Sequence, residues 1–240
     1  MYEVPEKCTG RVLARREFLG VGVCGAAALS VPPALSEDQA APPQINAAEL
    51  NPSQALELLY QGNRRFVAGE TIEPHRNLSR LKEIADRQTP FAAFLGCADS
   101  RVPIEIIFDQ GFGDLFVTRI AGNVATSENI GSLEFGTQVL GAKVLYVLGH
   151  TNCGAVAATM KREPVPGQIS SLFQFIRPAV RSVGNDLDAA VAQNVRLQAQ
   201  TLAEASPVLA ERIRSGNLIV AGGVYDLATG RVTPVSLDGT

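Results

Sequence analysis

The chain has 240 residues, which is enough for one well-packed domain together with a leader or additional helices. Its formal net charge is only -3 and it has no Lys/Arg-rich patch interleaved with aromatic residues, so nucleic acid is not expected as a partner. A hydrophobic content of 46% with ordinary charge density excludes an intrinsically disordered chain.

The first 36 residues resemble a twin-arginine export signal. Arg15 and Arg16, followed by Glu17, precede an uncharged run over residues 18–35, and small residues near its end offer a cleavage site. We therefore expect a signal peptide over residues 1–36, recognised by export machinery, and a periplasmic or equivalent extracytoplasmic location. An uncleaved membrane anchor and a lipoprotein signal ending at Cys24 are the alternatives.

Residues 37–50 are rich in Pro, Ala and polar residues and are expected to be a linker to a single domain over residues 51–240. Asn51 can cap a first helix, which Pro52 would begin, and Ser127 is the cap expected for a later one. Helical periodicity predicts helices over residues 52–67, 78–86, 104–108, 127–140, 154–160, 170–182, 187–204 and 207–214. Apolar runs predict strands over residues 91–95, 114–118, 143–148 and 218–225, with a hairpin partner ending near residue 235.

Strands that alternate with helices predict an α/β fold, in which a mainly parallel central β-sheet is flanked by helices. The apolar runs before Cys97 and His150 are continuous, which is typical of strands buried on both faces. Ligands of such sheets bind beyond the carboxyl ends of the strands. Both residues directly follow expected strands and are therefore expected at this edge.

Two short segments at these strand ends carry metal-ligating side chains, CADSRVP beginning at Cys97 and HTNC beginning at His150. Together with Cys153 they offer two thiolates and one imidazole, which suit zinc. Three protein ligands and an open position are typical of catalytic zinc, and water or Asp99 would take the fourth place. The remaining histidine, His75, is expected on the surface.

The other two cysteines, Cys8 and Cys24, lie in the leader. The expected domain therefore keeps two thiols, and both belong to the proposed zinc site. A disulfide scaffold would consume both ligands and is not expected.

The pair of segments, CADSRVP and HTNCGA, closely resembles the paired signatures of the β-class carbonic anhydrases, and the resemblance extends over residues 51–226. It implies a zinc-dependent lyase, carbonate dehydratase, that reversibly hydrates carbon dioxide to bicarbonate and a proton through a zinc-bound hydroxide. Cys97, His150 and Cys153 would be the zinc ligands. The resemblance also implies a homodimer or homotetramer, whose N-terminal helices wrap a partner subunit.

The same resemblance assigns roles to residues around the metal. Asp99 and Arg101 match the catalytic dyad of the family, in which a bidentate pair holds the carboxylate. If Asp99 left Arg101 and bound zinc, the site would be closed and inactive. Four further residues match substrate-binding positions, namely Gln88, Phe116, Phe135 and Gly154.

Purely structural roles remain open for some of these residues. Gln88 can be a surface amide, and Phe116 and Phe135 can belong to the core. The alternatives for the function are a CS2 or COS hydrolase on the same scaffold and a non-catalytic zinc- or bicarbonate-binding module. A zinc ion that only stabilises the fold would leave the Asp99-x-Arg101 pair without a purpose.

Overall fold

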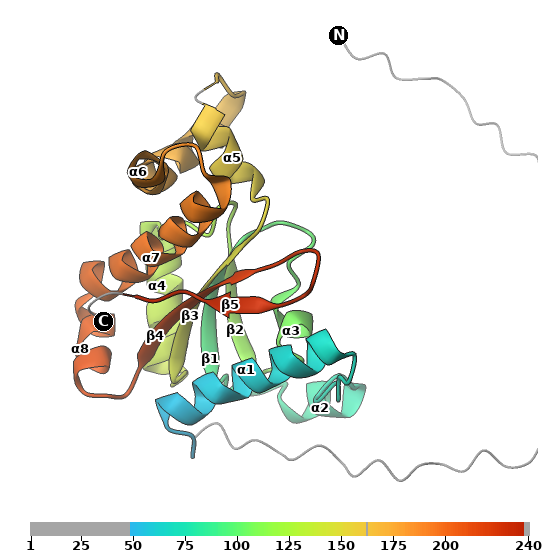
Figure 1. Ribbon diagram of the computed structural model, residues 1–240. Coiled ribbons are helices and arrows are strands. Elements are labelled where there is room, and N and C mark those ends of the chain that lie inside the picture. Colours follow the sequence, from blue (N-terminus) through green and yellow to red (C-terminus); the bar gives the residue numbers. More distant parts are fainter. Residues whose placement is uncertain (1–48, 162, 238–240) are drawn as a thin grey trace, which may run out of the picture. The chain divides into compact units, whose positions relative to one another are not determined.

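The central sheet of the computed structural model, which describes residues 49–161 and 163–237, has the strand order β2-β1-β3-β4-β5 (Figure 1). Four strands run parallel and β5 pairs antiparallel with β4, which confirms the predicted α/β fold. The strands are β1 (Ala92–Gly96), β2 (Leu115–Arg119), β3 (Val144–His150), β4 (Ile219–Tyr225) and β5 (Val232–Pro234). The predicted signal peptide and all but the last two residues of the predicted linker lie outside the described residues.

Helices cover both faces of the sheet (Figure 1). Helices α1 and α3 contribute to the apolar core on one face, and α4, α7 and α8 contribute to the core on the other. A third apolar cluster joins α5, α6 and α7 beyond the strand ends. The helices are α1 (Pro52–Ala68), α2 (Leu78–Glu83), α3 (Ile104–Ile107), α4 (Ser127–Glu134), α5 (Gly154–Lys161), α6 (Phe173–Val183), α7 (Leu187–Ala205) and α8 (Pro207–Arg214).

Burial on both faces explains the continuous apolar strands. Along β3, Val144, Tyr146 and Leu148 enter the core beneath α1, whereas Leu145 and Val147 enter the core beneath α7. Because successive side chains point to opposite faces, a strand covered on both sides needs apolar residues at every position.

The first helix begins where the sequence predicts. Asn51 Oδ1 accepts a hydrogen bond from the amide of Gln54 at 2.9 Å, and Gln54 Oε1 accepts one from the amide of Asn51 at 3.0 Å. This reciprocal pair satisfies two amides at the helix start. Further along α1, the buried Asn63 donates to the carbonyl of Gly230 at 2.9 Å and accepts from the amide of Val232 at 2.9 Å. The helix is thereby held against the β4–β5 hairpin.

The predicted helix over residues 127–140 is wrong in two respects. Thr126, not Ser127, is the N-cap, because Thr126 has the extended backbone and accepts the amide of Asn129. The α-helix ends at Glu134 and continues as a π-helix, η1 (Phe135–Val139). The hydroxyl of Thr137 donates to the carbonyl of Leu133 at 2.8 Å, a bond that bends helices.

Two other helices differ from their predicted lengths, and one side chain is placed differently. Helix α2 ends at Glu83, and the helix predicted over residues 170–182 begins as a 3-10 helix, η2 (Gly167–Leu172), before α6. The expectation that His75 is a surface residue is wrong. Its side chain is only 14% exposed, and its Nδ1 lies 2.7 Å from Asp114 Oδ1, a partner that spacing in the sequence does not indicate.

Within residues 49–161 and 163–237, none of the helices combines the length and the apolar character needed to span a bilayer.

Candidate metal centre

Three potential metal ligands meet at the carboxyl edge of the sheet. Cys97 follows β1, His150 is the last residue of β3, and Cys153 directly precedes α5. The parallel pairing of β1 with β3 brings the first two side chains to the same edge. The ligand atoms of all three residues lie within 4.8 Å of one another, and all three are buried. The structure thus brings together the residues that the two sequence segments predicted as zinc ligands.

The imidazole of His150 is prepared to bind a metal through Nε2. Its Nδ1 lies 2.9 Å from the carbonyl oxygen of Thr151, and since a carbonyl only accepts, Nδ1 carries the hydrogen. The lone pair is then on Nε2, which is buried and has no hydrogen-bond partner among the described residues. A buried polar atom without a partner is costly, and a metal ion at this position would remove that cost. Two thiolates and one imidazole suit zinc.

Backbone amides add to the thiolate character of Cys97. The hydrogen bond with the thiol of Cys153 is the largest cause that holds the pKa of Cys97 well below its usual range, against the opposing effect of burial. The amide of Gly122 contributes as well, and its nitrogen lies 3.4 Å from Cys97 Sγ. The bond with Cys97 and burial together raise the pKa of Cys153. A thiolate at Cys97 is the form that binds a cation.

A carboxylate and a guanidinium group lie next to the three ligands. Arg101 donates to both oxygens of Asp99, from Nε at 3.0 Å and from Nη2 at 2.8 Å, in the expected bidentate pair. This pair is the main reason why the pKa of Asp99 is well below its usual range, so the carboxylate is ionised. Asp99 Oδ2 lies 3.8 Å from His150 Nε2, beside the position that a metal would take.

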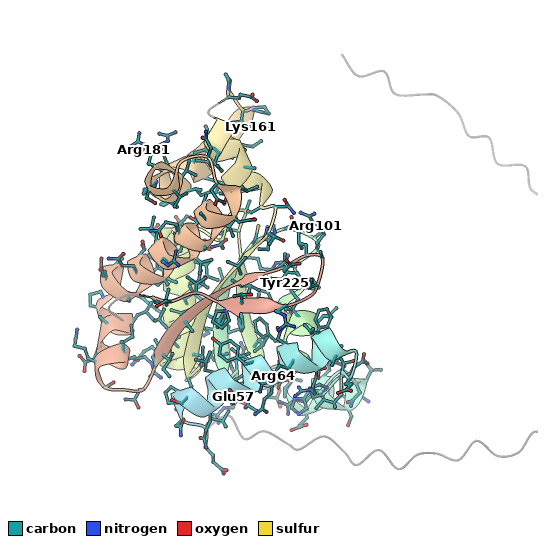
Figure 2. The ribbon with its side chains drawn as sticks, viewed as in Figure 1. Glu57, Arg64, Arg101, Lys161, Arg181 and Tyr225 are labelled. Carbon is teal, nitrogen blue, oxygen red and sulfur yellow. The ribbon has the colours of Figure 1, made fainter. Side chains whose placement is uncertain are left out.

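The two members of this pair differ in their exposure. The Asp99 side chain is 18% exposed and that of Arg101 is 56% exposed. Figure 2 shows Arg101 on the solvent side of the loop that follows β1. Arg101 therefore holds the carboxylate from outside, while the carboxylate itself is directed at the buried ligands.

Arg119, which the sequence analysis did not identify, supports the loop that carries Cys97 and Asp99. It is the last residue of β2, and its guanidinium donates to the carbonyl of Cys97 at 2.9 Å and to the carbonyl of Asp99 at 2.6 Å. The available signal was its position at the end of a third parallel strand, at the same edge as Cys97 and His150.

Two buried side-chain amides on α7 support the loop that follows β2. Asn194 donates to the carbonyl of Gly122 at 2.9 Å, and Gln198 accepts from the amide of Ala125 at 2.8 Å. Gln198 also donates to Asn194 Oδ1 at 3.1 Å, so the two side chains act together. They hold the segment whose amide reaches the sulfur of Cys97. Their signal in the sequence was their position as polar residues on the otherwise apolar buried face of α7.

The four residues that match substrate-binding positions lie at different places. Gly154 is the first residue of α5, next to Cys153, and a Cβ built on it meets nothing within 4 Å. Phe116 pairs with Ala93 in β1, four residues before Cys97, which corresponds to about 13 Å along the strand. Phe135 packs on Phe116 with ring centroids 6.3 Å apart, and Gln88 is an exposed residue before the amino end of β1. Within one chain, Gly154 alone of the four adjoins the ligands.

Comparisons with known proteins agree with this geometry. A family model described as carbonic anhydrase matches residues 92–232. A carbonic anhydrase of Mycolicibacterium smegmatis is 37% identical over 190 residues, which cover 76% of this chain and 92% of that protein.

Solved structures agree as well. A β-carbonic anhydrase of Coccomyxa, solved in complex with acetazolamide, has a TM-score of 0.60 at 28% identity and covers 75% of this chain and 86% of its own. A tetrameric β-carbonic anhydrase of Sordaria macrospora has the same TM-score at 22% identity, over 65% of this chain and 85% of its own, and shares the fold.

The support from Arg119 is testable. Replacement of Arg119 by Met removes both hydrogen bonds to the Cys97 loop, so we expect zinc affinity to fall about 10- to 100-fold. The affinity is measured by competition with a chromogenic chelator. The matched control is Arg214→Met, because Arg214 lies on α8, where it pairs with Glu211. Equal zinc affinity in the Arg119 variant and the control would contradict the assigned role.

Proposed function

Because this chain belongs to the β-class carbonic anhydrase family, it catalyses the reversible hydration of carbon dioxide with zinc as its cofactor, and we propose that Cys97, His150 and Cys153 hold that zinc. The observation that carries this assignment is the convergence of three buried ligand atoms beside an ionised carboxylate. His150 Nε2, which has no other partner among the described residues, completes the ligand set.

The residues around the ligands have distinct roles in the reaction. Zinc, when bound, supplies the Lewis acidity that activates a water for attack on the carbon of carbon dioxide. Asp99 accepts a hydrogen bond from the attacking water and directs its lone pair toward the substrate. Because Arg101 keeps Asp99 ionised, Asp99 acts as an acceptor and the proton leaves to solvent. Arg101 also occupies both carboxylate oxygens and so keeps Asp99 from turning onto the metal.

Gly154 is proposed to bind the substrate at the start of α5. The absence of a side chain leaves the space above its backbone open, and the amide at a helix start favours a developing negative charge. The apolar cluster that surrounds Cys97 and Cys153, which includes Val124 and Val156, suits an uncharged substrate such as carbon dioxide. A site that only binds zinc would have no use for the Asp99–Arg101 pair, and the curated relatives are named for hydration rather than for hydrolysis of CS2 or COS.

Gln88, Phe116 and Phe135 are proposed to complete the site of a partner subunit in a homodimer or homotetramer. They lie too far along the sheet to reach the ligands of their own chain. Phe135 and Val139, on η1 beside the edge strand β2, are 47% and 65% exposed, as expected of residues covered on assembly. We also propose that the N-terminal helices wrap the partner.

Residues 1–36 are proposed to export the protein through twin-arginine machinery to the periplasm or an equivalent compartment. The support is the Arg15-Arg16 pair before an uncharged run. This route carries folded proteins, so zinc can be loaded while Cys97 and Cys153 are still reduced. Once they bind the metal, both thiolates are less available for oxidation outside the cytoplasm.

The enzyme assignment is tested by stopped-flow hydration of carbon dioxide on zinc-loaded protein. Arg101→Ala frees Asp99 from its fixed position, and we expect kcat/KM to fall by about 100-fold or more while about one zinc per chain remains. The control Arg214→Ala removes an exposed arginine on α8 and leaves activity unchanged. Near-full activity of the Arg101 variant would refute the dyad, and zinc-loaded wild-type protein without activity would refute the assignment.

The shared site is tested at its exposed aromatic residue. Phe135→Arg places a charge on the proposed interface, so we expect both a smaller particle by sedimentation velocity and a loss of hydration activity. Val208→Arg, at an exposed apolar position on α8, is the control. An unchanged sedimentation coefficient and unchanged activity in Phe135→Arg would place the interface elsewhere.

The export proposal is tested by expression of the full chain in a bacterium with twin-arginine machinery. With Arg15→Lys and Arg16→Lys combined, we expect the protein to accumulate in the cytoplasm with its leader attached, detected by fractionation and mass spectrometry. Arg11→Lys, which preserves the pair, is exported as before. Export of the double variant at the wild-type level would rule out this route.

A further inference from the structure

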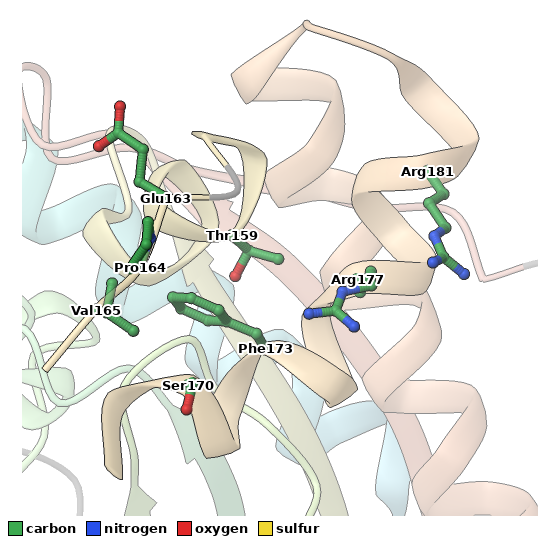
Figure 3. A pocket seen from close by; sticks show the side chains of 8 residues that line it. All are labelled: Thr159, Glu163, Pro164, Val165, Ser170, Phe173, Arg177 and Arg181. Carbon is green, nitrogen blue, oxygen red and sulfur yellow. The ribbon is translucent and has the colours of Figure 1, made fainter. Parts of the chain in front are cut away.

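A cavity lies near the end of α5 that is farther from the metal ligands. Its volume is about 660 Å³, within the range of small-molecule sites, and residues of α5, α6, η2 and the segment between α5 and η2 line it (Figure 3). None of the three metal ligands, Asp99 or Arg101 belongs to its lining. Thr159, the α5 residue that lines the cavity, is six residues after Cys153, which corresponds to about 9 Å along the helix.

Two arginines that have no acidic partner among the described residues line one side of this cavity. Arg177 and Arg181 are four residues apart on α6, so they lie on the same face of the helix. Within the described part of the chain, neither forms an ion pair or a side-chain hydrogen bond. Glu163 also lines the cavity, but its carboxylate points away from both guanidinium groups (Figure 3).

Two helical arginines of this protein that do have acidic partners serve as a comparison. Arg64 pairs with Glu57 at 2.6 Å and Arg214 pairs with Glu211 at 2.6 Å. The α6 sequence FQFIRPAVRSV contains no carboxylate at all, so the repulsion between the two like charges is not relieved within the helix. A bound anion would relieve it.

The rest of the lining is suited to an organic ligand. Phe173, Pro164 and Val165 form an apolar wall, and the ring of Phe173 faces the cavity between the arginine side and the loop (Figure 3). The hydroxyl of Thr159 donates to the carbonyl of Ala155 at 2.8 Å and keeps its lone pairs for a second partner. The hydroxyl of Ser170 makes no hydrogen bond within the described residues and is free to donate to an anion.

From these contacts we propose that the cavity is a binding site for a small organic oxyanion, a carboxylate or phosphate carried on an apolar body. Arg177 and Arg181 bind the oxygens through charge-assisted hydrogen bonds, the geometry for which the guanidinium group is suited. The apolar body packs against Phe173, Pro164 and Val165. This proposal is independent of the reaction at the metal centre.

The proposal is tested by isothermal titration calorimetry on the zinc-loaded protein, with phenyl phosphate, benzoate, inorganic phosphate and phenol as probes. We expect one site per chain with a Kd of about 1 mM or lower for phenyl phosphate or benzoate, and the tighter of the two identifies the anion class. Inorganic phosphate lacks the apolar body and phenol lacks the charge, so each should bind at least about tenfold more weakly.

Matched variants locate the bound probe. Arg177→Gln combined with Arg181→Gln should weaken binding at least about tenfold, since it removes two charged donors. Arg231→Gln, at an exposed arginine that also lacks an ion pair within the described residues, should bind like the wild type. Hydration activity of each variant verifies folding, because none of these arginines is near the metal ligands.

Two results would overturn the proposal. The first is the absence of binding by both phenyl phosphate and benzoate at concentrations well above about 1 mM. The second is equal affinity in the double variant and the wild type, which would place the anion elsewhere, including at the metal. If the double variant were inactive, Arg177→Lys combined with Arg181→Lys would replace it. This variant keeps both charges but loses the planar guanidinium groups, so the proposal then requires it to bind the probe more weakly than the wild type without losing binding.

Discussion

The parallel register between β1 and β3 is the constraint on which the site depends. Hydrogen bonding aligns Gly96 with Leu148, so Cys97 leaves the sheet beside the end of β3, where His150 lies. The apolar cores on both faces fix this register, because a shift by one residue would turn every strand side chain to the opposite face. The absence of a side chain at Gly96 lets the strand pack closely against Ile104, since a Cβ on Gly96 would lie 2.5 Å from the Ile104 side chain. The packing that stabilises the fold therefore also sets the spacing of the metal ligands.

Polar side chains that hydrogen-bond to the loops around the ligands keep the site rigid. Arg119 holds the carbonyls of Cys97 and Asp99, and Asn194 with Gln198 holds the segment whose amide reaches the Cys97 sulfur. Buried polar groups are tolerated only when they are hydrogen-bonded, and here the bonds end on the backbone of the two loops that carry the site. Residues at the ends of β1, β2 and β3 and on α7 thus all contribute to the one site formed by the proposed ligands. A metal held by the proposed ligands would complete this arrangement by satisfying His150 Nε2, which has no hydrogen-bond partner among the described residues.

A single subunit offers two kinds of surface away from its own metal ligands. One is the edge beside β2, where Phe135 and Val139 are exposed, and we assign it to a partner subunit. The other is the cavity lined by Arg177 and Arg181, which we assign to a small oxyanion. They differ in their physical character, because the first is an apolar edge and the second combines two arginines, which form no ion pair with a described residue, with an apolar wall. The sheet edge thus positions the proposed reaction centre, whereas helices α5 and α6 form the charged pocket.

The sequence by itself determined the α/β fold, the strand and helix order and the two ligand segments, because apolar periodicity and local spacing express these features directly. The Asn51 cap was also local, and the structure confirms it. The sequence did not determine the end of α4, the contact of His75 with Asp114 or the roles of Arg119 and Asn194. Each of these depends on contacts between residues far apart in the chain, such as His75 with Asp114 or Asn194 with Gly122. Only tertiary packing brings such partners together, so the tertiary structure decided how the proposed ligands are supported, while the sequence predicted which residues they are.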